Sequence, residues 1–395
     1  MRWKNNKQNL ILAFFVIVAI FGGGLFVYKT KTNVVVAPQI HEAVRFGGIV
    51  PLTGTRSAYG VPLQRAAQLA VDEINKKGGL FGEQIQIFWE DGKCLPAAAK
   101  AAAEKLVTKA KVQFIFGGVC SNETLAAAPI TEAGKVVLIS PASTAAEITS
   151  SGQYVFRLTQ SDTLVGSVAA NYAFTNLGYK KVAIVRENTS YITGIATSFI
   201  NSFKGLHGEV VYDQKYNTGA RGSAAFITEA LKANPDVIYL LPDSPTQGLQ
   251  QLEKLKTAKN TIPIIVDEVL LDGALVTADP EIFEGVIGVQ SYFDNGTERA
   301  QKFLASYKQQ YAEDPKFPYF MANMYDAVYL AKNAIEKNGS DPDKIKSWLL
   351  AQKRWPGVAG DVTFDANGDY LAKFSIVKIN AGKVEFQEVY DTSKK

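Results

Sequence analysis

A repeated alternation of short apolar strands and amphipathic helices constrains the fold of this chain more than any other feature. It runs from residue 44 to about residue 140, restarts near Phe156, and continues to residue 266. Repeated βαβ units of this length imply parallel sheets with helices on both faces. The predicted strands are Val44–Val50, Gln84–Trp89, Phe114–Gly117, Val136–Ser140, Lys181–Val185, Glu209–Tyr212, Val237–Leu241 and Ile262–Val266. The predicted helices are Gly60–Lys76, Ala97–Lys109, Asn122–Ala133, Thr193–Lys204, Gly222–Ala233 and Gln247–Thr257.

The last third of the chain adds to these two runs. Glu298–Tyr311 and Tyr319–Glu336 are predicted helices that return to pack on parts already built. Three closing antiparallel strands are predicted around a turn at residues 365–369. They are Asp361–Phe364, Phe374–Ile379 and Val384–Val389. The turn is not a calcium loop, because Ile376 stands where such a loop needs its bidentate acid. The pattern therefore predicts an α/β protein with two doubly wound parallel-sheet lobes.

Size and charge limit the possible partners. With 395 residues, 47% of them hydrophobic, the chain has material for two domains. The formal charge of +4 is misleading, because five basic residues and no acid lie in residues 1–31. Residues 32–395 carry a net charge of −1 without them. No nucleic-acid-binding surface is therefore expected.

The first 31 residues have the character of a targeting segment. Leu10–Tyr28 is uncharged, mostly apolar and flanked by lysines, which suits a membrane span. Gly22–Gly24 could serve as a cleavage site, but the apolar run continues beyond it. We interpret residues 1–31 as a membrane anchor in preference to a cleaved signal, and residues 32–43 as a linker. The folded part is then extracytoplasmic, tethered to the cytoplasmic membrane by residues 10–28.

Signatures of catalysis are lacking. The sequence contains no nucleophile elbow, dinucleotide-binding turn or phosphate loop. His41 and His207 are the only histidines, and with two cysteines they make no convincing metal site. We expect no metal, no cofactor and no catalytic residues, so an enzyme is the weakest hypothesis.

Polar turns follow several of the predicted strands. Cys94 and Cys120 each lie in such a turn, and Ser140–Thr144, with the sequence Ser-Pro-Ala-Ser-Thr, forms another. Ligands bind at the carboxyl ends of strands in open α/β sheets. The cysteine pair and the Ser140–Thr144 loop resemble the type I periplasmic binding proteins, specifically the branched-chain amino acid branch. The resemblance extends from about Phe46 to about Val389.

The resemblance implies a hinge of three crossovers, at Phe156–Thr159, Val286–Ser291 and Pro356–Asp361. The first lobe would then contain residues 44–157 and 291–357, and the second residues 158–290 and 358–395. Cys94 and Cys120 lie in one lobe beside neighbouring strand ends of an exported protein. We therefore predict a disulfide between them.

Seven candidate ligand-binding residues lie just beyond predicted strand ends. In the resembled receptors, the positions of Ser121 and Thr144 bind the ligand carboxylate. The Ala142 carbonyl, Thr144 and Glu268 match positions that hold the α-ammonium, and two aromatic residues close over the ligand. The candidates are Tyr59, Ser121, Ala142, Thr144, Tyr191, Asp243 and Glu268.

Several of the candidates also have a structural interpretation. Ser121 is a natural N-cap for the helix that follows it, and Thr144 with Glu147 forms a capping-box pattern. Glu268 could be a solvated loop acid, and Tyr191 a cap on a helix face.

Asp243 departs from the family pattern, which has an aromatic residue there. No lysine or arginine occurs among the candidate positions to neutralise it, so a ligand with a polar or cationic side chain is predicted over leucine, isoleucine or valine. Alternatively, Asp243 turns outward and caps the helix that begins near residues 244–246.

The preferred hypothesis is a monomeric, membrane-tethered solute-binding protein. It would capture an amino acid or similar small zwitterion by hinge closure and deliver it to the permease of an ABC importer. The alternatives are a binding protein for an amide, a urea or an aromatic acid, and a ligand-sensing ectodomain for a separate signalling partner.

Overall fold

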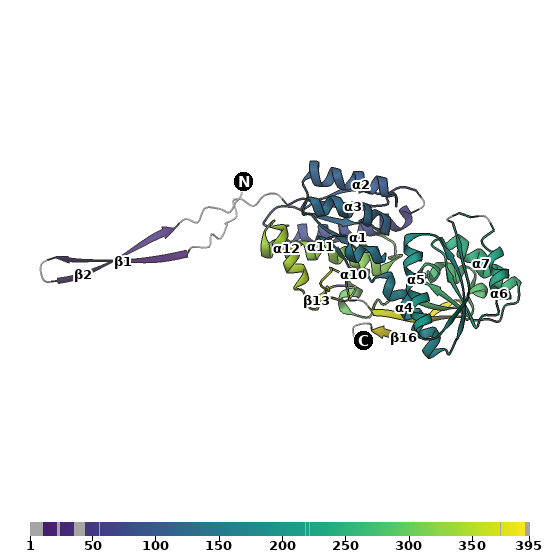
Figure 1. The fold of residues 1–395 in the computed structure, drawn as a ribbon. Coiled ribbons are helices and arrows are strands. Elements are labelled where there is room, and N and C mark those ends of the chain that lie inside the picture. Colours follow the sequence, from purple (N-terminus) through teal and green to yellow (C-terminus); the bar gives the residue numbers. More distant parts are fainter. Residues whose placement is uncertain are drawn as a thin grey trace. The chain divides into compact units, whose positions relative to one another are not determined.

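The computed structural model describes residues 11–21, 24–34, 44–54, 56–217, 219–220, 222–371 and 373–391. The chain divides into two units, residues 1–42 and residues 43–395. The second unit is an α/β protein built around two separate sheets (Figure 1).

The N-terminal unit differs from the predicted membrane span over residues 10–28. Strands β1 (Ile11–Phe21) and β2 (Gly24–Val34) pair antiparallel, with Ile11 opposite Val34. Isoleucine, valine and phenylalanine favour extended strands, which explains this outcome. Among the described residues, no helix is both long and apolar enough to cross a membrane. Residues 35–43 of the predicted linker lie outside the described residues.

The first sheet has five parallel strands in the order β4-β3-β5-β6-β7. Helices cover both of its faces, because strands buried on two sides need apolar cover on each. Helices α1, α10, α11 and α12 share a core with Phe46 and Phe116. Helices α2 and α3 share the opposite core with Ile115 and Leu138. The bounds are β3 Phe46–Val50, β4 Ile87–Asp91, β5 Phe114–Gly117, β6 Val137–Ser140, β7 Val155–Arg157, α1 Ser57–Lys76, α2 Pro96–Lys105, α3 Ser121–Ala133, α10 Glu298–Tyr311, α11 Pro318–Asn338 and α12 Pro342–Leu350.

The second sheet has seven strands in the order β16-β15-β12-β11-β10-β8-β9. Five are parallel, and β15 and β16 add an antiparallel edge. One core contains residues of α4 and α5, and the opposite core contains residues of α6 to α9. The bounds are β8 Lys181–Glu187, β9 Glu209–Tyr216, β10 Val237–Leu241, β11 Ile264–Asp267, β12 Ile287–Ser291, β15 Lys373–Asn380, β16 Lys383–Asp391, α4 Asp162–Asn171, α5 Ser190–Gly205, α6 Ala225–Lys232, α7 Pro245–Thr257, α8 Gly273–Ala278 and α9 Pro280–Phe283.

These two sheets confirm the predicted pair of doubly wound lobes. We call them lobe 1, with sheet β4-β3-β5-β6-β7, and lobe 2, with the seven-stranded sheet. Helices α4, α8, α9 and α12 were not predicted from the sequence. Short helical turns η1 (Leu106–Ala110), η2 (Ala146–Ser150), η3 (Tyr172–Asn176) and η4 (Glu268–Leu270) complete the elements used below.

The third connection between the lobes lies later in the chain than predicted. Strands β13 (Trp355–Pro356) and β14 (Asp361–Val362) pair with each other, and Val362 and Phe364 belong to the core of lobe 1. Asp326 on α11 holds this segment, because its carboxylate accepts the N–H groups of Val358 and Ala359 at 2.9 and 3.0 Å. The chain therefore enters lobe 2 again only after Phe364, not at Pro356–Asp361.

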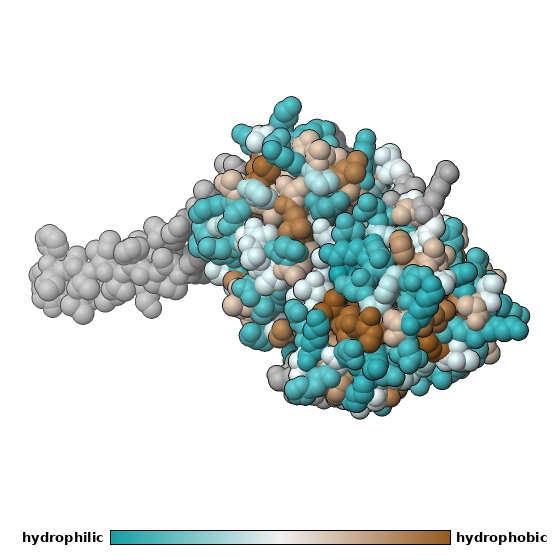
Figure 2. Space-filling model, turned by 45° about the vertical axis from the view of Figure 1, so that its right-hand side comes forward, coloured by the Kyte–Doolittle hydropathy of each residue, from teal (hydrophilic) through white to brown (hydrophobic). Residues whose placement is uncertain are grey.

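On the face shown in Figure 2, hydrophilic side chains predominate, and a brown cluster and smaller apolar areas lie among them. Single exposed apolar side chains are ordinary on soluble proteins and need no special explanation. The large ones are Phe81, Phe88, Leu95, Leu371, Phe386 and Val389.

Candidate ligand-binding site

The strand order of each sheet indicates where a ligand would bind, and the position is equivalent in the two lobes. In each lobe the first parallel strand lies between the second and the third, in the order β4-β3-β5 and β9-β8-β10. Ligands of doubly wound proteins bind at this switch point, beyond the carboxyl ends of the two diverging strands. In lobe 1 the residues there are Tyr59 and Ser121, and in lobe 2 they are Tyr191 and Asp243.

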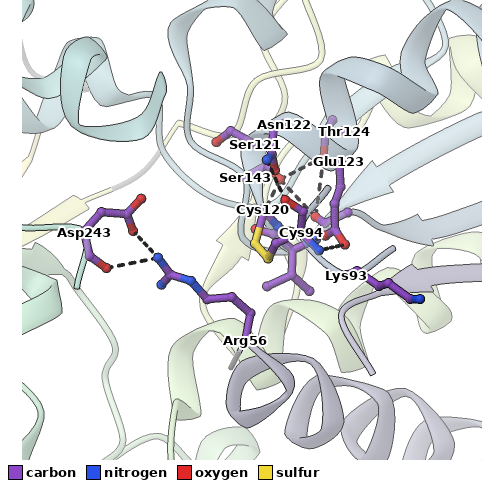
Figure 3. Close-up of a disulfide and its surroundings, with 12 residues drawn as sticks. Arg56, Lys93, Cys94, Cys120, Ser121, Asn122, Glu123, Thr124, Ser143 and Asp243 are labelled. Carbon is purple, nitrogen blue, oxygen red and sulfur yellow. Dashed lines mark hydrogen bonds and ion pairs between the residues drawn. A yellow bond between two sulfur atoms is a disulfide. The ribbon is translucent and has the colours of Figure 1, made fainter. Parts of the chain in front are cut away.

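The predicted disulfide is present beside this edge. Cys94 and Cys120 are bonded, with Cα atoms 5.4 Å apart (Figure 3). Buried Glu123 holds both sides of it, since its carboxylate accepts N–H groups from Cys94 at 2.9 Å and Cys120 at 3.1 Å. Burial raises the pKa of Glu123, and these hydrogen bonds oppose the rise. Bonded sulfurs offer no thiolate, so the grouping of Cys94, Cys120 and Glu123 is not a metal site.

Hydroxyl groups fasten the Ser140–Thr144 loop to the strand end beside it. Ser140 Oγ donates to the Gly118 carbonyl at 2.8 Å and accepts the N–H of Ser143 at 2.9 Å. Ser143 Oγ also donates to Gly118, at 3.0 Å. The half-buried Ala142 donates its N–H to Ser140 Oγ at 3.3 Å. The small polar residues of this motif therefore shape a loop, a role that the sequence did not distinguish from ligand contact.

Ser121 and Thr144 come together, but neither is a helix cap. The N-cap of α3 is Cys120, and Ser121 is the first helical residue. The N-cap of η2 is Ala145, so the predicted capping box at Thr144 is wrong. Ser121 Oγ instead accepts the N–H groups of Thr144 at 3.3 Å and Ala145 at 3.1 Å. Ser121 thus holds the backbone of the second loop against the start of α3.

Arg157 is a fully buried residue that fixes the same loop from the hinge. Its Nη1 donates to the carbonyls of Thr144 and Ala145, both at 2.9 Å. Nε and Nη2 each donate to the Asp369 carboxylate at 2.7 Å, and Nη2 also donates to Thr149. These contacts use all five donors of the guanidinium group. Arg157 therefore links the third crossover to the loop that carries Thr144.

Acidic side chains line the facing end of lobe 2. The Tyr191 hydroxyl, near the start of α5, donates to Asp267 Oδ2 at 2.9 Å. Asp267 is fully buried, and its Oδ1 has no hydrogen-bond partner among the residues that the structure describes. Glu268 follows β11 and is half-buried, not solvated, and its Oε2 accepts from Ser291 Oγ at 2.9 Å. Tyr191 thus contacts an acid of the site and is not a mere cap.

A third carboxylate, Asp162, stands where the chain has just left lobe 1. Its backbone N–H donates to the Thr144 carbonyl at 2.8 Å, and its side chain packs against Gly194 of α5. The side chain is fully buried, and within the described part of the chain neither carboxylate oxygen meets the geometry of a hydrogen bond. Burial raises the pKa of Asp162, the nearby Thr144 side chain and the Arg157 charge oppose this rise, and the Glu268 and Asp267 charges add to it. A cation placed among these acids would relieve both effects.

Asp243 is paired, which overturns both expectations for it. Arg56, just before α1, donates from Nη2 to Asp243 Oδ1 at 3.0 Å and to the Asp243 carbonyl at 3.2 Å (Figure 3). The cation that the candidate positions lacked is therefore supplied by lobe 1. Asp243 does not cap α7 either, since the N-cap is Ser244. The argument for a cationic ligand side chain fails with this pairing.

Tyr59 adjoins that ion pair. Its ring stacks on Phe317 with centroids 4.5 Å apart, and the Arg56 guanidinium carbon lies 6.0 Å from the ring centroid. Burial raises the pKa of Tyr59; Arg56 opposes this, while Asp243 and Asp267 add to it. Tyr59 of lobe 1 therefore faces the acids of lobe 2.

Sequence reasoning missed Arg56, Asp162 and Asp267 as members of this region. Asp267 precedes Glu268, but acidic neighbours are common in any chain with 38 acids. Asp162 has the position of an ordinary acid in the first turn of a helix. Only Arg56 could have been found from the sequence, because it lies three positions before the candidate Tyr59.

Comparisons with known proteins agree with this fold. A sequence model of the family described as periplasmic binding protein matches residues 43–383. The Leu/Ile/Val-binding protein BraC3 of Rhizobium johnstonii is 30% identical, with 90% of this chain and 98% of the relative covered. A branched-chain amino acid transporter substrate-binding protein of Streptococcus pneumoniae, solved with isoleucine, is 31% identical with a TM-score of 0.79, covering 89% of this chain and all of that one.

A more distant relative shares the fold alone. It is a solute-binding protein of an ABC transporter from Rhodopseudomonas palustris, solved with 3,4-dihydroxybenzoic acid. It is 23% identical with a TM-score of 0.76, and the match covers 89% of this chain and 99% of that one.

Proposed function

This chain belongs to the periplasmic binding protein family, and on that premise we propose that it binds an amino acid between its two lobes for delivery to an ABC importer. The observation that carries the proposal is the group of acids at Asp162, Asp267 and Glu268, the first two fully buried and the third half-buried, beside the Ser121 and Thr144 loops. Oxygen atoms without partners occur in two of these acids. Buried carboxylates of this kind need a cation, and an α-ammonium group is one of suitable size.

The loops of lobe 1 offer the complementary donors. Ser121 Oγ accepts two N–H groups, so its own hydroxyl hydrogen is left to donate to an anion. Ser121 also begins α3, whose N-terminus favours a negative charge. An α-carboxylate at Ser121 and an α-ammonium at Glu268 would bridge the two lobes and hold them closed, with no bond made or broken.

The ligand we propose has an uncharged side chain. Tyr59 and Phe317 form an aromatic wall, and the Arg56–Asp243 pair beside it carries no net charge. This environment suits an aliphatic group better than a cation, in accord with the leucine-, isoleucine- and valine-binding relatives. An aromatic acid without an ammonium group is the rival ligand. It fits the site less well, because it would leave the acids of lobe 2 without a cation.

Glu268→Gln is expected to weaken binding of L-isoleucine by about 1.5–3 kcal/mol, close to tenfold to a hundredfold. The variant keeps the size of the side chain and removes the charge that would face the ammonium. Isothermal titration calorimetry measures the affinity, and thermal unfolding without ligand reports whether the fold is retained.

Glu132→Gln is the matched control. Glu132 is also half-buried and accepts a backbone N–H, from Tyr154 at 3.0 Å, but it lies in lobe 1 away from the acids. The affinity of the Glu132→Gln variant for L-isoleucine should equal that of the wild type. If Glu268→Gln and Glu132→Gln had equal affinities, the ammonium would not be bound at Glu268. Binding of benzoate but of no amino acid would favour the aromatic acid as the ligand.

We also propose that the folded part lies outside the cytoplasm, exported and tethered by the N-terminal unit. Five basic residues and an apolar run over residues 10–28 support this, as does the family. N-terminal sequencing of the protein recovered from cell envelopes tests it. Retention of Met1 is expected from a tether, and a new N-terminus near residue 24 would mean that the segment is cleaved.

A further inference from the structure

We propose that Arg56 and Asp243 form a latch between the lobes, and that closing this latch is coupled to ligand binding. The residues are separated by 187 positions in sequence and come from opposite lobes. Among the described residues, the other ion pairs lie within one lobe, apart from Arg157–Asp369 at the hinge. The pair is therefore a charged contact that exists only while the lobes are together.

The backbone of each partner is anchored within its own lobe. Asp243 and Ser244 donate their N–H groups to buried Glu187, at 2.8 and 3.0 Å. Pro242 and Pro245 flank the segment, which restricts its backbone further. On the other side, Arg56 directly precedes α1. A preorganised pair loses little conformational entropy on forming, so more of its attraction stabilises the closed arrangement.

Exposure sets the strength of the latch. The side chains are 29% and 19% exposed, so water and salt screen them less than a fully exposed pair. Because the ligand binds between the closed lobes, an interaction that raises the fraction of closed protein raises the apparent affinity by the same factor. Ligand and latch should therefore strengthen each other, and salt should weaken both.

The latch also selects against charged ligands, an inference that rests on the proposed function. Arg56 and Asp243 neutralise each other next to Tyr59, at the place we assign to the ligand side chain. Without Arg56, the Asp243 carboxylate would be left without its cation and would favour a cationic side chain. Without the Asp243 charge, Arg56 would favour an anionic one.

The test uses Arg56→Met, Asp243→Asn, the two combined, and the charge exchange Arg56→Asp with Asp243→Arg. Arg299→Met is the matched control, because Arg299 pairs with Asp361 at 2.9 Å inside lobe 1. Small-angle X-ray scattering of ligand-free protein at low and high salt measures closure. Calorimetry with L-leucine, L-lysine and L-glutamate measures affinity and selectivity, and thermal unfolding checks the fold.

Each single variant should expand the ligand-free protein and weaken L-leucine binding about tenfold. The double variant should be no worse than either single one, and the charge exchange should recover most of the loss. The affinity for L-lysine relative to L-leucine should rise in Arg56→Met. The affinity for L-glutamate relative to L-leucine should rise in Asp243→Asn. Arg299→Met should match the wild type in both measurements.

Additive losses in the double variant, or single variants that behave like Arg299→Met, would overturn the latch even if amino acids bind. Scattering that responds to the pair in a protein that binds no amino acid would leave the latch standing and refute the proposed function. The two ideas therefore fail separately.

Discussion

Replacing Arg157 with alanine is expected to lower the free energy of unfolding by about 3–5 kcal/mol. The guanidinium group is fully buried, and all five of its donors are used. Its removal leaves the Asp369 carboxylate without its cation and the carbonyls of Thr144 and Ala145 without donors. Chemical denaturation followed by circular dichroism measures the loss.

Arg186→Ala provides the comparison for this prediction. Arg186 is nearly buried and makes a similar two-point contact with Asp213, at 2.6 and 2.8 Å, but binds no loop carbonyl. Arg186→Ala should lower the free energy of unfolding by less than Arg157→Ala does. Arg157→Lys should lie between these two variants, because lysine keeps the charge but has only three donors. If Arg157→Ala were no more harmful than Arg186→Ala, Arg157 would not be the support of the Thr144 loop that we describe.

Removal of the Cys94–Cys120 disulfide is expected to lower the free energy of unfolding by about 3–4 kcal/mol, the value for a closed loop of about 27 residues. The cross-link acts mainly on the unfolded chain, which it prevents from expanding fully. The native loops should keep their shape, because Glu123 still accepts N–H groups from both sides of the bond. Affinity for L-isoleucine should therefore change little.

The measurement compares wild type with and without dithiothreitol, and with a Cys94→Ala, Cys120→Ala double variant. Only the wild type should respond to the reductant, and the reduced wild type should resemble the variant. Two alkylatable thiols in the exported protein before reduction would show that the bond does not form. A loss of ligand affinity in the double variant would instead mean that Glu123 alone cannot hold the loops.

The predictions of the two lobes and of several element bounds were correct because they depend on local order. The periods of strand and helix indicated doubly wound lobes, since a strand buried on both faces and a one-faced helix have different apolar patterns. The bounds of α10 and β5 agree with the prediction to the residue. By contrast, an apolar run rich in isoleucine, valine and phenylalanine is ambiguous, and the N-terminal unit is a strand pair where a span was expected.

Charge pairing was the weakest part of the prediction. The candidate loop positions contain no lysine or arginine to pair with Asp243, and its actual partner, Arg56, lies outside that set and 187 residues away. The same holds for Arg157 and Asp369, 212 residues apart. The strength of such contacts depends on distance and burial, and neither quantity is encoded in the spacing of residues along the chain.

The order of residues along the chain was enough to predict the two parallel-sheet lobes and the strand ends at which polar residues gather. All of these follow from local periodicity and from the rule that parallel strands end at one edge of a sheet. The burial of Asp162 and Asp267 beside Glu268, and the contact of Arg56 with Asp243, became visible only in the folded protein. The physical reason is that packing two lobes against each other sets which charges lose their water and which find a partner.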